Sequence, residues 1–254
     1  MEKEAVLLLK INDEKWIKKL KNGEVCFNRS GFFIEKALKD NNNEQGDLFE
    51  GVFAHIHKGN TLLVESISKH GSDLEIIDDG NYVFLRRKSS RNRPIFCMYG
   101  ITIDDLVVNK KDIEKGTNKA KAIYNMPTKM YEGFLDNSND NLFSAWGFYA
   151  SAGFFQDSLK QALKSKNYSY LCKMVSYDLD LSQEFYIEPT PDYPELFHKR
   201  KDLSYQHEVR YVLPKDSTSD KIIINMEPIS NHSAGIAKGN LLMEFTVIVE
   251  ENNN

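Results

Sequence analysis

Residues 205–213 read Tyr-Gln-His-Glu-Val-Arg-Tyr-Val-Leu. Aromatic and β-branched residues recur at alternate positions, which predicts a strand with one face turned to a core. The other face carries Gln206, Glu208 and Arg210, because side chains at i and i+2 point the same way. Two interpretations of this polar face are open: a solvated face with a Glu–Arg neighbour pair, or the wall of a cleft.

The chain on either side of this strand is rich in strand patterns. An apolar run at 5–11 predicts a strand, Asn12 or Asp13 caps a helix that ends at Asn22-Gly23, and 24–28 predicts a second strand. Further helices are predicted after Ser30 and Ser151, and further strands at 52–57, 61–67, 74–78, 81–87, 95–101, 145–150, 168–177, 184–188, 221–227 and 241–249.

This order of elements predicts an α+β fold. We expect a single domain over residues 1–251, built of two packed, mainly antiparallel sheets with a few helices, and a frayed tail at 252–254. The stretch 104–142 mixes charged helical and loop patterns and gives no clear element.

Composition limits the functional classes. The chain has 254 residues, 41% of them hydrophobic, and a formal net charge of −4, so a chain-wide basic coat for nucleic acid is excluded while a local basic groove is not. The apolar runs, such as 5–9, are far shorter than the roughly 20 residues that span a bilayer. The charged N-terminus lacks a signal-peptide pattern. We therefore expect a cytoplasmic protein with no membrane contact.

No metal site is predicted. Cys26, Cys97 and Cys172 lie far apart and lack C-x-x-C spacing, so we expect buried, reduced thiols. His55 and His57 alternate on one strand face, an arrangement that binds metal only with a third ligand, and the sequence offers none nearby.

The spacing of Gln206 and Glu208 suits one kind of chemistry. When an N-glycosidic bond to ribose breaks, positive charge develops on the sugar, and a fixed carboxylate that accepts from the 2′-hydroxyl stabilises that charge more than the ground state. Glycosidases use carboxylates for the same reason. An amide two residues earlier is placed to orient the acceptor.

Two further charged segments invite a functional interpretation. The loop 86–93 carries five Lys and Arg residues and either grips phosphate groups or forms a solvated hairpin tip. Asp47 and Glu50 either organise the cleft by accepting backbone N–H bonds or serve as ordinary turn carboxylates. Lys199, just before the Gln-x-Glu strand, belongs to a second short basic run.

Taken together, these pieces resemble the bacterial ADP-ribosyltransferase superfamily, in particular its toxin–antitoxin and phage-defence branch (CmdT-like and, more distantly, DarT-like). Gln206-x-Glu208 is similar to the superfamily's late Gln-x-Glu or Glu-x-Glu motif. The opening strand–helix–strand, the segment Gly46-Asp47-x-x-Glu50-Gly51 and the strand from Ile95 to Tyr99 also resemble that group in order and spacing. Where many members carry His or Arg on the first strand, this chain has Lys10.

The resemblance implies an activity and a set of site residues. It implies an NAD-dependent ADP-ribosyltransferase toxin that releases nicotinamide and modifies nucleic acid, RNA rather than DNA, and that has an antitoxin protein as partner. NAD would be the co-substrate, with no metal. The implied residues are Glu208 and Gln206 for catalysis, Lys10, Asn28, Arg29 and Tyr99 for NAD, and Arg86, Arg87, Arg91 and Lys199 for the substrate.

Three alternatives stay open from the sequence. One is a catalytically silent binding or sensor module of the same fold, whose signature would be a cleft too shallow for NAD or a structural salt bridge from Glu208 to Arg210 or Lys199. The others are a transferase that modifies protein and a hydrolase that only cleaves NAD.

Overall fold

A computed structural model describes residues 4–40, 46–108, 119–127, 146–215, 217, 219–229, 234–238 and 242–248. These residues form a mixed α+β structure whose sheets are antiparallel except for one short strand pair, so the predicted fold class is confirmed at that level. The tail predicted at 252–254 lies outside the described residues. No helix in the described ranges is both long and apolar enough to cross a bilayer.

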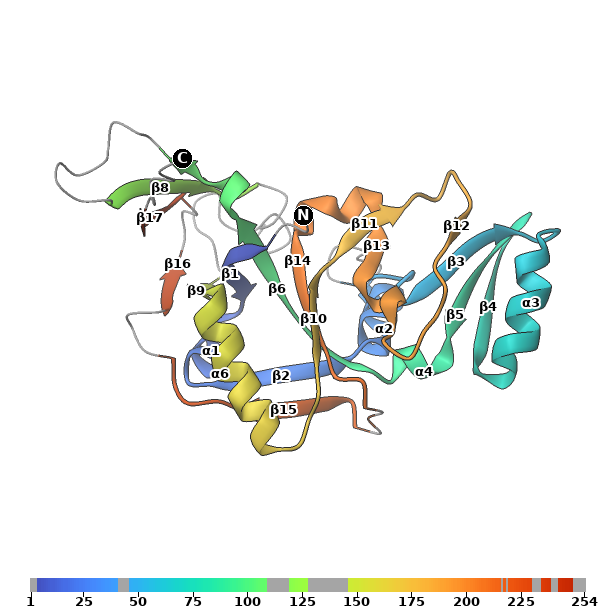
Figure 1. Cartoon of the computed structure of the whole chain (residues 1–254), viewed down its shortest axis with the longest axis horizontal. Helices are drawn as coiled ribbons and strands as arrows, with labels where there is room; N and C mark the ends of the chain where they lie inside the picture. The colour runs from blue at the N-terminus through green and yellow to red at the C-terminus, as the bar shows by residue number, and fades with distance from the viewer. Residues whose placement is uncertain are drawn as a thin grey trace, which may run out of the picture.

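The largest sheet has eight strands and carries most of the core (Figure 1). Its main path, in spatial order, is β10 (Leu171–Met174), β14 (Glu208–Val212), β6 (Pro94–Thr102), β1 (Ala5–Asn12), β9 (Trp146–Ser151) and β16 (Ala234–Lys238). Off this path, β2 (Glu24–Arg29) pairs with β6 and with β15 (Lys221–Asn225).

Three smaller sheets complete the described strands. The four-stranded sheet has the order β12 (Phe185–Tyr186), β3 (Val52–His57), β5 (Tyr82–Arg87) and β4 (Leu74–Asp79). The three-stranded sheet has the order β17 (Leu242–Ile248), β8 (Lys119–Asn125) and β7 (Val107–Val108). The two-stranded sheet is the parallel pair β11 (Ser176–Leu179) and β13 (His198–Arg200). The expectation of two packed sheets is therefore too simple, because the described strands outside the large sheet form three separate smaller sheets.

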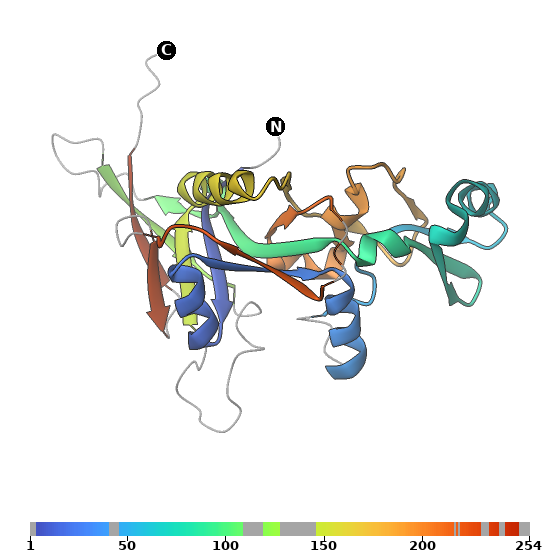
Figure 2. The same ribbon diagram turned by 90° about the horizontal axis from the view of Figure 1, so that it is seen from below.

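The helices are α1 (Glu14–Lys21), α2 (Gly31–Asp40), α3 (Thr61–His70), α4 (Lys88–Arg91) and α6 (Ala152–Ser165), with 3-10 turns η1 (Gly71–Asp73), η2 (Ile103–Asp105), η4 (Pro194–Phe197) and η5 (Lys201–Gln206). Figure 2 shows α6 along one side of the large sheet, with α1 and α2 projecting from the other. The α6 residues Phe155, Leu159 and Leu163 are fully buried, in one core cluster with Val209 and Tyr211 of β14. The polar face of β14 therefore points away from α6.

A fork in the large sheet positions the site. The strand β6 pairs with β14 along one edge, whereas two different strands share its other edge. The strand β1 pairs with the C-terminal half, up to Tyr99, and β2 pairs with Ile95 and Pro94 at the N-terminal end. Residues 96–98 lie between the two pairings. The ammonium of Lys10 donates to the carbonyl of Cys97 at 2.7 Å, and so satisfies a backbone group in the open part of the fork.

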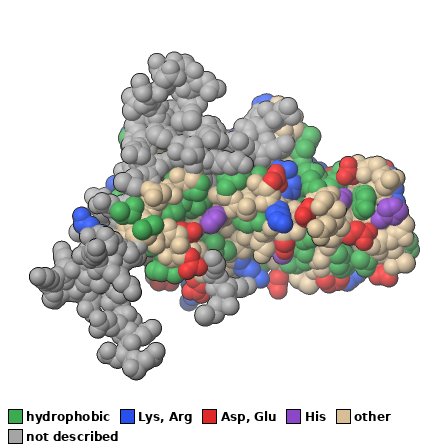
Figure 3. All heavy atoms as spheres, turned by 90° about the horizontal axis from the view of Figure 1, so that it is seen from above, with side chains coloured by type: hydrophobic (Ala, Val, Ile, Leu, Met, Phe, Trp, Pro, Cys, Tyr) green, Lys and Arg blue, Asp and Glu red, His purple; other side chains and the backbone are tan. Residues whose placement is uncertain are grey.

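A smaller lobe of β3, β4, β5, β12 and α3 occupies one end of the molecule (Figure 1). Phe53, Ile56 and Leu85 lie in its own apolar cluster. On the face seen in Figure 3, acidic and basic side chains of the described residues are interspersed rather than gathered by sign. That mixture agrees with the near-balanced composition.

The strand predicted at 61–67 is wrong. These residues begin α3, and the side chain of Asn60 caps the helix by accepting from the Leu62 amide at 3.0 Å. The dipeptide Gly59-Asn60 therefore precedes a helix rather than a second strand. Apolar runs of this length fit either a strand or a helix, and here the cap decided between them.

The strand predicted from Tyr205 begins three residues later. Residues 201–206 form η5, and His207 has left-handed backbone angles, φ 39° and ψ 46°. Such angles interrupt a strand, so β14 starts at Glu208. The alternation argument for Gln206 and Glu208 therefore does not hold, although other contacts bring the two side chains together.

Gly23 joins α1 to β2 at a close backbone approach. It has φ +90°, and a Cβ built there would lie 2.2 Å from the carbonyl oxygen of Met226. We expect Gly23→Ala to lower the free energy of unfolding by more than about 2 kcal/mol, since left-handed strain costs about 1–2 kcal/mol and the backbone clash adds to it. Gly80→Ala is the control, because Gly80 has φ +66° and open space. If chemical denaturation showed the same loss of unfolding free energy for Gly23→Ala and Gly80→Ala, the backbone clash at Gly23 would be contradicted.

Candidate functional site

A cleft of about 1090 Å³ opens beside the fork, between α1 and α2. Ligand pockets in proteins are typically about 300–1,000 Å³, so this cleft has room for a dinucleotide. Its polar walls include Lys10, Asn28, Arg29, Tyr99, Lys199, Gln206, Glu208 and Arg210. One signature of a silent module was a cleft too shallow for NAD, and by volume this cleft is not too small for NAD.

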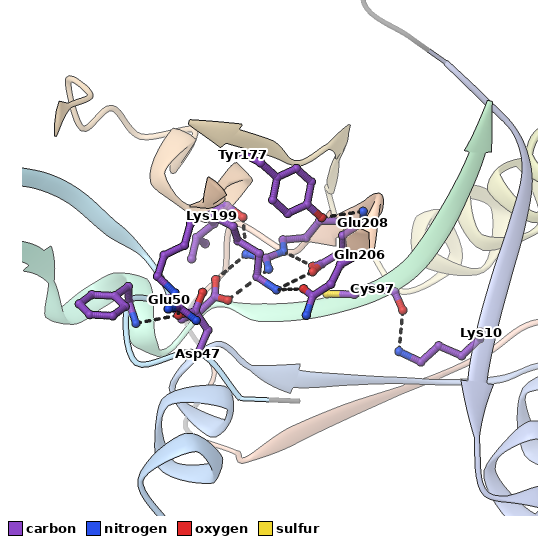
Figure 4. Close-up of polar contacts among 12 residues, drawn as sticks. Lys10, Asp47, Glu50, Cys97, Tyr177, Lys199, Gln206 and Glu208 are labelled. Carbon is purple, nitrogen blue, oxygen red and sulfur yellow. Dashed lines mark hydrogen bonds and ion pairs between the residues drawn. The ribbon is translucent and has the colours of Figure 1, made fainter. Parts of the chain in front are cut away.

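Glu208 and Gln206 meet at one ammonium group in the wall of this cleft (Figure 4). Lys199 on β13 donates to Gln206 Oε1 and to Glu208 Oε2, each at 2.8 Å. The strand β13 is held next to β11, whose Tyr177 hydroxyl accepts from the Glu208 amide at 2.9 Å. The contacts of Lys199 thus bring Gln206 and Glu208 together, which the sequence had assigned to a shared strand face.

Arg210 joins Glu208 to a distant loop. Its Nε donates to Glu208 Oε1 at 2.7 Å, and its two terminal nitrogens form a bidentate pair with the carboxylate of Glu50. Glu208 and Arg210 are 7% and 1% exposed, so a solvated Glu–Arg neighbour pair is excluded. The second signature of a silent module, a salt bridge from Glu208 to Arg210 or Lys199, is present to both partners.

The loop that supplies Glu50 organises itself through Asp47. Asp47 accepts from the amide of Phe49, two residues further along the chain, at 2.9 Å, which is the contact of an ordinary turn carboxylate, and Asp47 does not line the cleft. Its carboxylate also lies 3.7 Å from the Arg200 guanidinium. The sequence marked both carboxylates as candidates, but it did not predict that Glu50 pairs with Arg210.

The charges of this group set the ionisation of Glu208. Burial by itself raises the pKa of the Glu208 carboxyl, but the charges of Arg210 and Lys199 outweigh burial and hold that pKa well below its usual range. Burial lowers the pKa of the Lys199 ammonium, but the carboxylates of Glu208, Glu50 and Asp47 together outweigh burial, so the pKa is raised. Glu208 is therefore a permanent anion at neutral pH.

Glu208 retains a little capacity to accept a further hydrogen bond. It accepts from Arg210, Lys199 and the thiol of Cys97. An ionised carboxylate has about four acceptor positions, so about one remains for a ligand hydroxyl. Cys97 supplies no nucleophile, because burial first and the Glu208 charge second raise the pKa of its thiol to about 12.

The four residues predicted to hold a dinucleotide all line the cleft. Lys10 is occupied by the Cys97 carbonyl and lies 5.4 Å from the centre of the Phe96 ring. Arg29 is held by Glu35 at 2.9 Å and by Asp220 at 3.0 Å. Asn28 accepts a weak hydrogen bond from Cys26.

Tyr99 is a wall residue rather than a free polar group. Its hydroxyl accepts from Tyr124 at 2.6 Å, and its ring stacks on His207 with centroids 5.4 Å apart. It is 5% exposed, so it limits the cleft and supports the turn between Gln206 and Glu208.

The basic segment 86–93 is not a solvent-exposed loop. Arg86 and Arg87 belong to β5 and are buried, and Arg91 ends α4 beside Glu35 and Glu75. Arg87 is paired with Glu195 at 2.6 Å. None of these three arginines lines the cleft, whereas Lys199, the fourth predicted substrate residue, does. Burial against carboxylates explains the difference, because a paired guanidinium has little left to offer a phosphate.

The structure also places residues in the cleft that the sequence did not single out for it. They are the aromatic side chains of Trp16, Phe32, Phe33 and Tyr205 and the lysines Lys36 and Lys221. Trp16 is 38% exposed, whereas its α1 neighbours Ile17 and Leu20 are buried. No local signal distinguishes an aromatic residue at a cleft mouth from one in a core.

Within the described ranges, no group of three or more His, Cys, Asp and Glu residues is arranged to hold a metal ion. The Nδ1 atom of His55 lies 3.0 Å from the Gln183 carbonyl oxygen, in a hydrogen bond, and His57 has no third ligand beside it.

Comparison of the chain with protein-family models, with curated proteins and with solved structures finds no match. Functional inference therefore depends on the geometry of the cleft.

The Arg210 contacts predict a large effect on stability. We expect Arg210→Met to lower the free energy of unfolding by about 3–5 kcal/mol, because it leaves Glu50 and Glu208 buried without their shared cation. Lys18→Met is the control: Lys18 pairs with Glu14 at 2.9 Å on the exposed face of α1, and its loss should change stability by less than about 0.5 kcal/mol. Urea denaturation measures the free energy of unfolding of both variants. If Arg210→Met left that free energy nearly unchanged, Arg210 would not be the stabilising partner of Glu50 and Glu208.

Glu208 also predicts an acid-sensitive stability. Because its folded-state pKa is depressed, Glu208 contributes stability that is fully present above the ordinary carboxyl pKa, about 4.5, and is lost as pH falls below it. In this acid range, unfolding of the wild type takes up the proton of Glu208, which gives the plot of unfolding free energy against pH a slope of up to about 1.4 kcal/mol per pH unit. Glu208→Gln should remove this part of the slope.

Leu159→Ala, which creates a cavity under the large sheet and costs about 2–5 kcal/mol, controls for destabilisation alone. It should keep the wild-type slope below pH 4.5. A Glu208→Gln variant with the same slope as wild type would rule out the contribution of this carboxylate.

Proposed function

We propose that the protein is an NAD-dependent ADP-ribosyltransferase whose reaction takes place in the cleft between α1 and α2. The observation that carries the proposal is a buried carboxylate, Glu208, that is held ionised in the wall of a dinucleotide-sized cleft beside the amide of Gln206. A fixed anion of this kind favours a state in which the bound sugar is more positive than in the ground state.

In the proposed reaction the bond between ribose C1′ and the nicotinamide nitrogen breaks, and the electron pair leaves with nicotinamide. Positive charge develops at C1′, and Glu208 stabilises it while accepting from the ribose 2′-hydroxyl. The acceptor nucleophile then forms the new bond to C1′ and releases its proton to solvent. Gln206, which cannot act as a base, orients the acceptor through its amide.

The acceptor and the biological setting follow from the resemblance in sequence. The resemblance implies that the acceptor is nucleic acid, with RNA favoured over DNA. It also implies that the protein is a cytoplasmic toxin or phage-defence enzyme with an antitoxin partner. A protein acceptor is the second choice, and hydrolysis of NAD is the outcome when water takes the acceptor's place.

One observation favours a second candidate, a silent nucleotide-binding module. Glu208 is paired with both Lys199 and Arg210, and these two cations reduce the negative potential that a developing cation would meet. A silent module would bind NAD in the same cleft and release no nicotinamide, so product analysis separates the two candidates.

Turnover of NAD tests the proposal. We expect purified protein to release nicotinamide and to transfer labelled ADP-ribose to RNA, and Glu208→Gln to lower the rate at least about 100-fold, the usual cost of losing one stabilising group. Glu188→Gln is the control, because Glu188 is an exposed carboxylate paired with Lys69 outside the cleft. Circular dichroism verifies that each variant is folded.

If Glu208→Gln does not fold, Gln206→Ala provides a second test, since it should lower transfer more than NAD cleavage. NAD binding without nicotinamide release would support the silent module. Equal turnover by wild type and by a folded Glu208→Gln variant would refute the catalytic role of Glu208.

A further inference from the structure

Two large aromatic side chains are exposed at the mouth of the cleft, one on each wall. Trp16 of α1 is 38% exposed and Phe32 of α2 is 40% exposed, and both line the cleft. Figure 2 shows α1 and α2 projecting from the same side of the large sheet, and each helix contributes one of the two rings to the lining of the cleft. Exposed aromatic rings beside a cleft are candidates for stacking a planar ligand.

Lysines accompany both rings. The ammonium groups of Lys15 and Lys19 lie 5.4 and 5.1 Å from the Trp16 ring centre. Lys36 is one helical turn from Phe32 on α2, and Lys221 is paired in register with Asn28 across β15 and β2. Within the described part of the chain, neither Lys36 nor Lys221 has an ion-pair partner, although each lines the cleft.

The charge of the cleft differs from that of the whole chain. The described residues that line the whole cleft include seven cations and five anions, while the whole chain carries a net charge of −4. Four of the other described cations that line the cleft are held by carboxylates and the fifth, Lys10, donates to the Cys97 carbonyl, so the positive charge without such a contact lies at Lys36 and Lys221. Planar rings and cations without ion-pair partners in one cleft fit a chain of bases joined by phosphates, whereas a peptide would gain little from the lysines.

We propose that the mouth of the cleft binds single-stranded nucleic acid, with Trp16 and Phe32 stacking on bases and Lys36 and Lys221 contacting phosphates. Glu208, which is 7% exposed, lies deeper in the same cleft. A base held at the mouth would thus be presented to the deeper wall. The inference deepens the proposed function, because it names the surface that delivers the acceptor, but the binding itself requires no NAD.

Binding of a short, fluorescently labelled, mixed-sequence single-stranded RNA tests the proposal without NAD. We expect Trp16→Ala and Phe32→Ala each to weaken binding about 10-fold, the usual effect of removing one stacking ring. Trp16→Phe should retain most of the affinity because it keeps a ring. The matched control is Phe154→Ala: Phe154 is also 40% exposed, on α6 along the other side of the sheet, and its loss should leave binding unchanged.

Salt dependence tests the lysines separately. Lys36→Gln and Lys221→Gln should each reduce the slope of log affinity against log salt by about 0.7, the value for one phosphate contact on a single strand. Quenching of intrinsic fluorescence by RNA should be lost in Trp16→Phe, in which Trp146 is the remaining tryptophan.

Equal affinity of wild type, Trp16→Ala and Phe32→Ala would overturn the proposal, as would preferential binding of duplex RNA or the absence of RNA binding at low salt. Labelling of protein in place of RNA during NAD turnover would also overturn it, by naming the other class of acceptor. RNA binding without any NAD turnover would instead refute the proposed transferase activity, while the proposed nucleic-acid-binding surface would still be supported.

Discussion

The arrangement of the cleft depends on one guanidinium shared between two buried carboxylates. Arg210 binds Glu50 from the loop before β3 and Glu208 on its own strand, and it also donates to the Leu196 carbonyl in η4. Taking these charges out of water costs several kcal/mol for each ion, and only close, well-directed hydrogen bonds offset that cost. Segments distant in the sequence must therefore meet in one geometry.

The fork in the large sheet is the second constraint. Because β1 and β2 pair with different parts of β6, the sheet cannot close over residues 96–98, and a cleft results. Lys10 satisfies the Cys97 carbonyl in that opening. The residue that the resemblance assigned to NAD thus already has a structural contact, which a ligand would have to share or displace.

The pairing of Glu208 has two sides. Arg210 and Lys199 keep the carboxylate ionised in a buried position, which a group that stabilises a developing cation requires. The same two cations occupy most of its acceptor positions and weaken its field at the ligand. The two proposals, catalysis and silent binding, therefore differ in whether the remaining acceptor position of Glu208 can bind the hydroxyl of a ligand.

The sequence by itself determined the α+β class and most of the strands of the large sheet, and it made Glu208 a candidate, because strand patterns and a polar face in an apolar strand are local signals. It misplaced α3, where an apolar run fits both a helix and a strand and the cap at Asn60 decided. It also assigned phosphate binding to Arg86 and Arg87, because it could not show that Glu75 and Glu195 would bury them. Only the tertiary structure brought Lys199 between Gln206 and Glu208, paired Glu50 with Arg210 and left Trp16 and Phe32 exposed at one opening. Those contacts join residues far apart in the chain, and their energies depend on burial and charge, which no local pattern records.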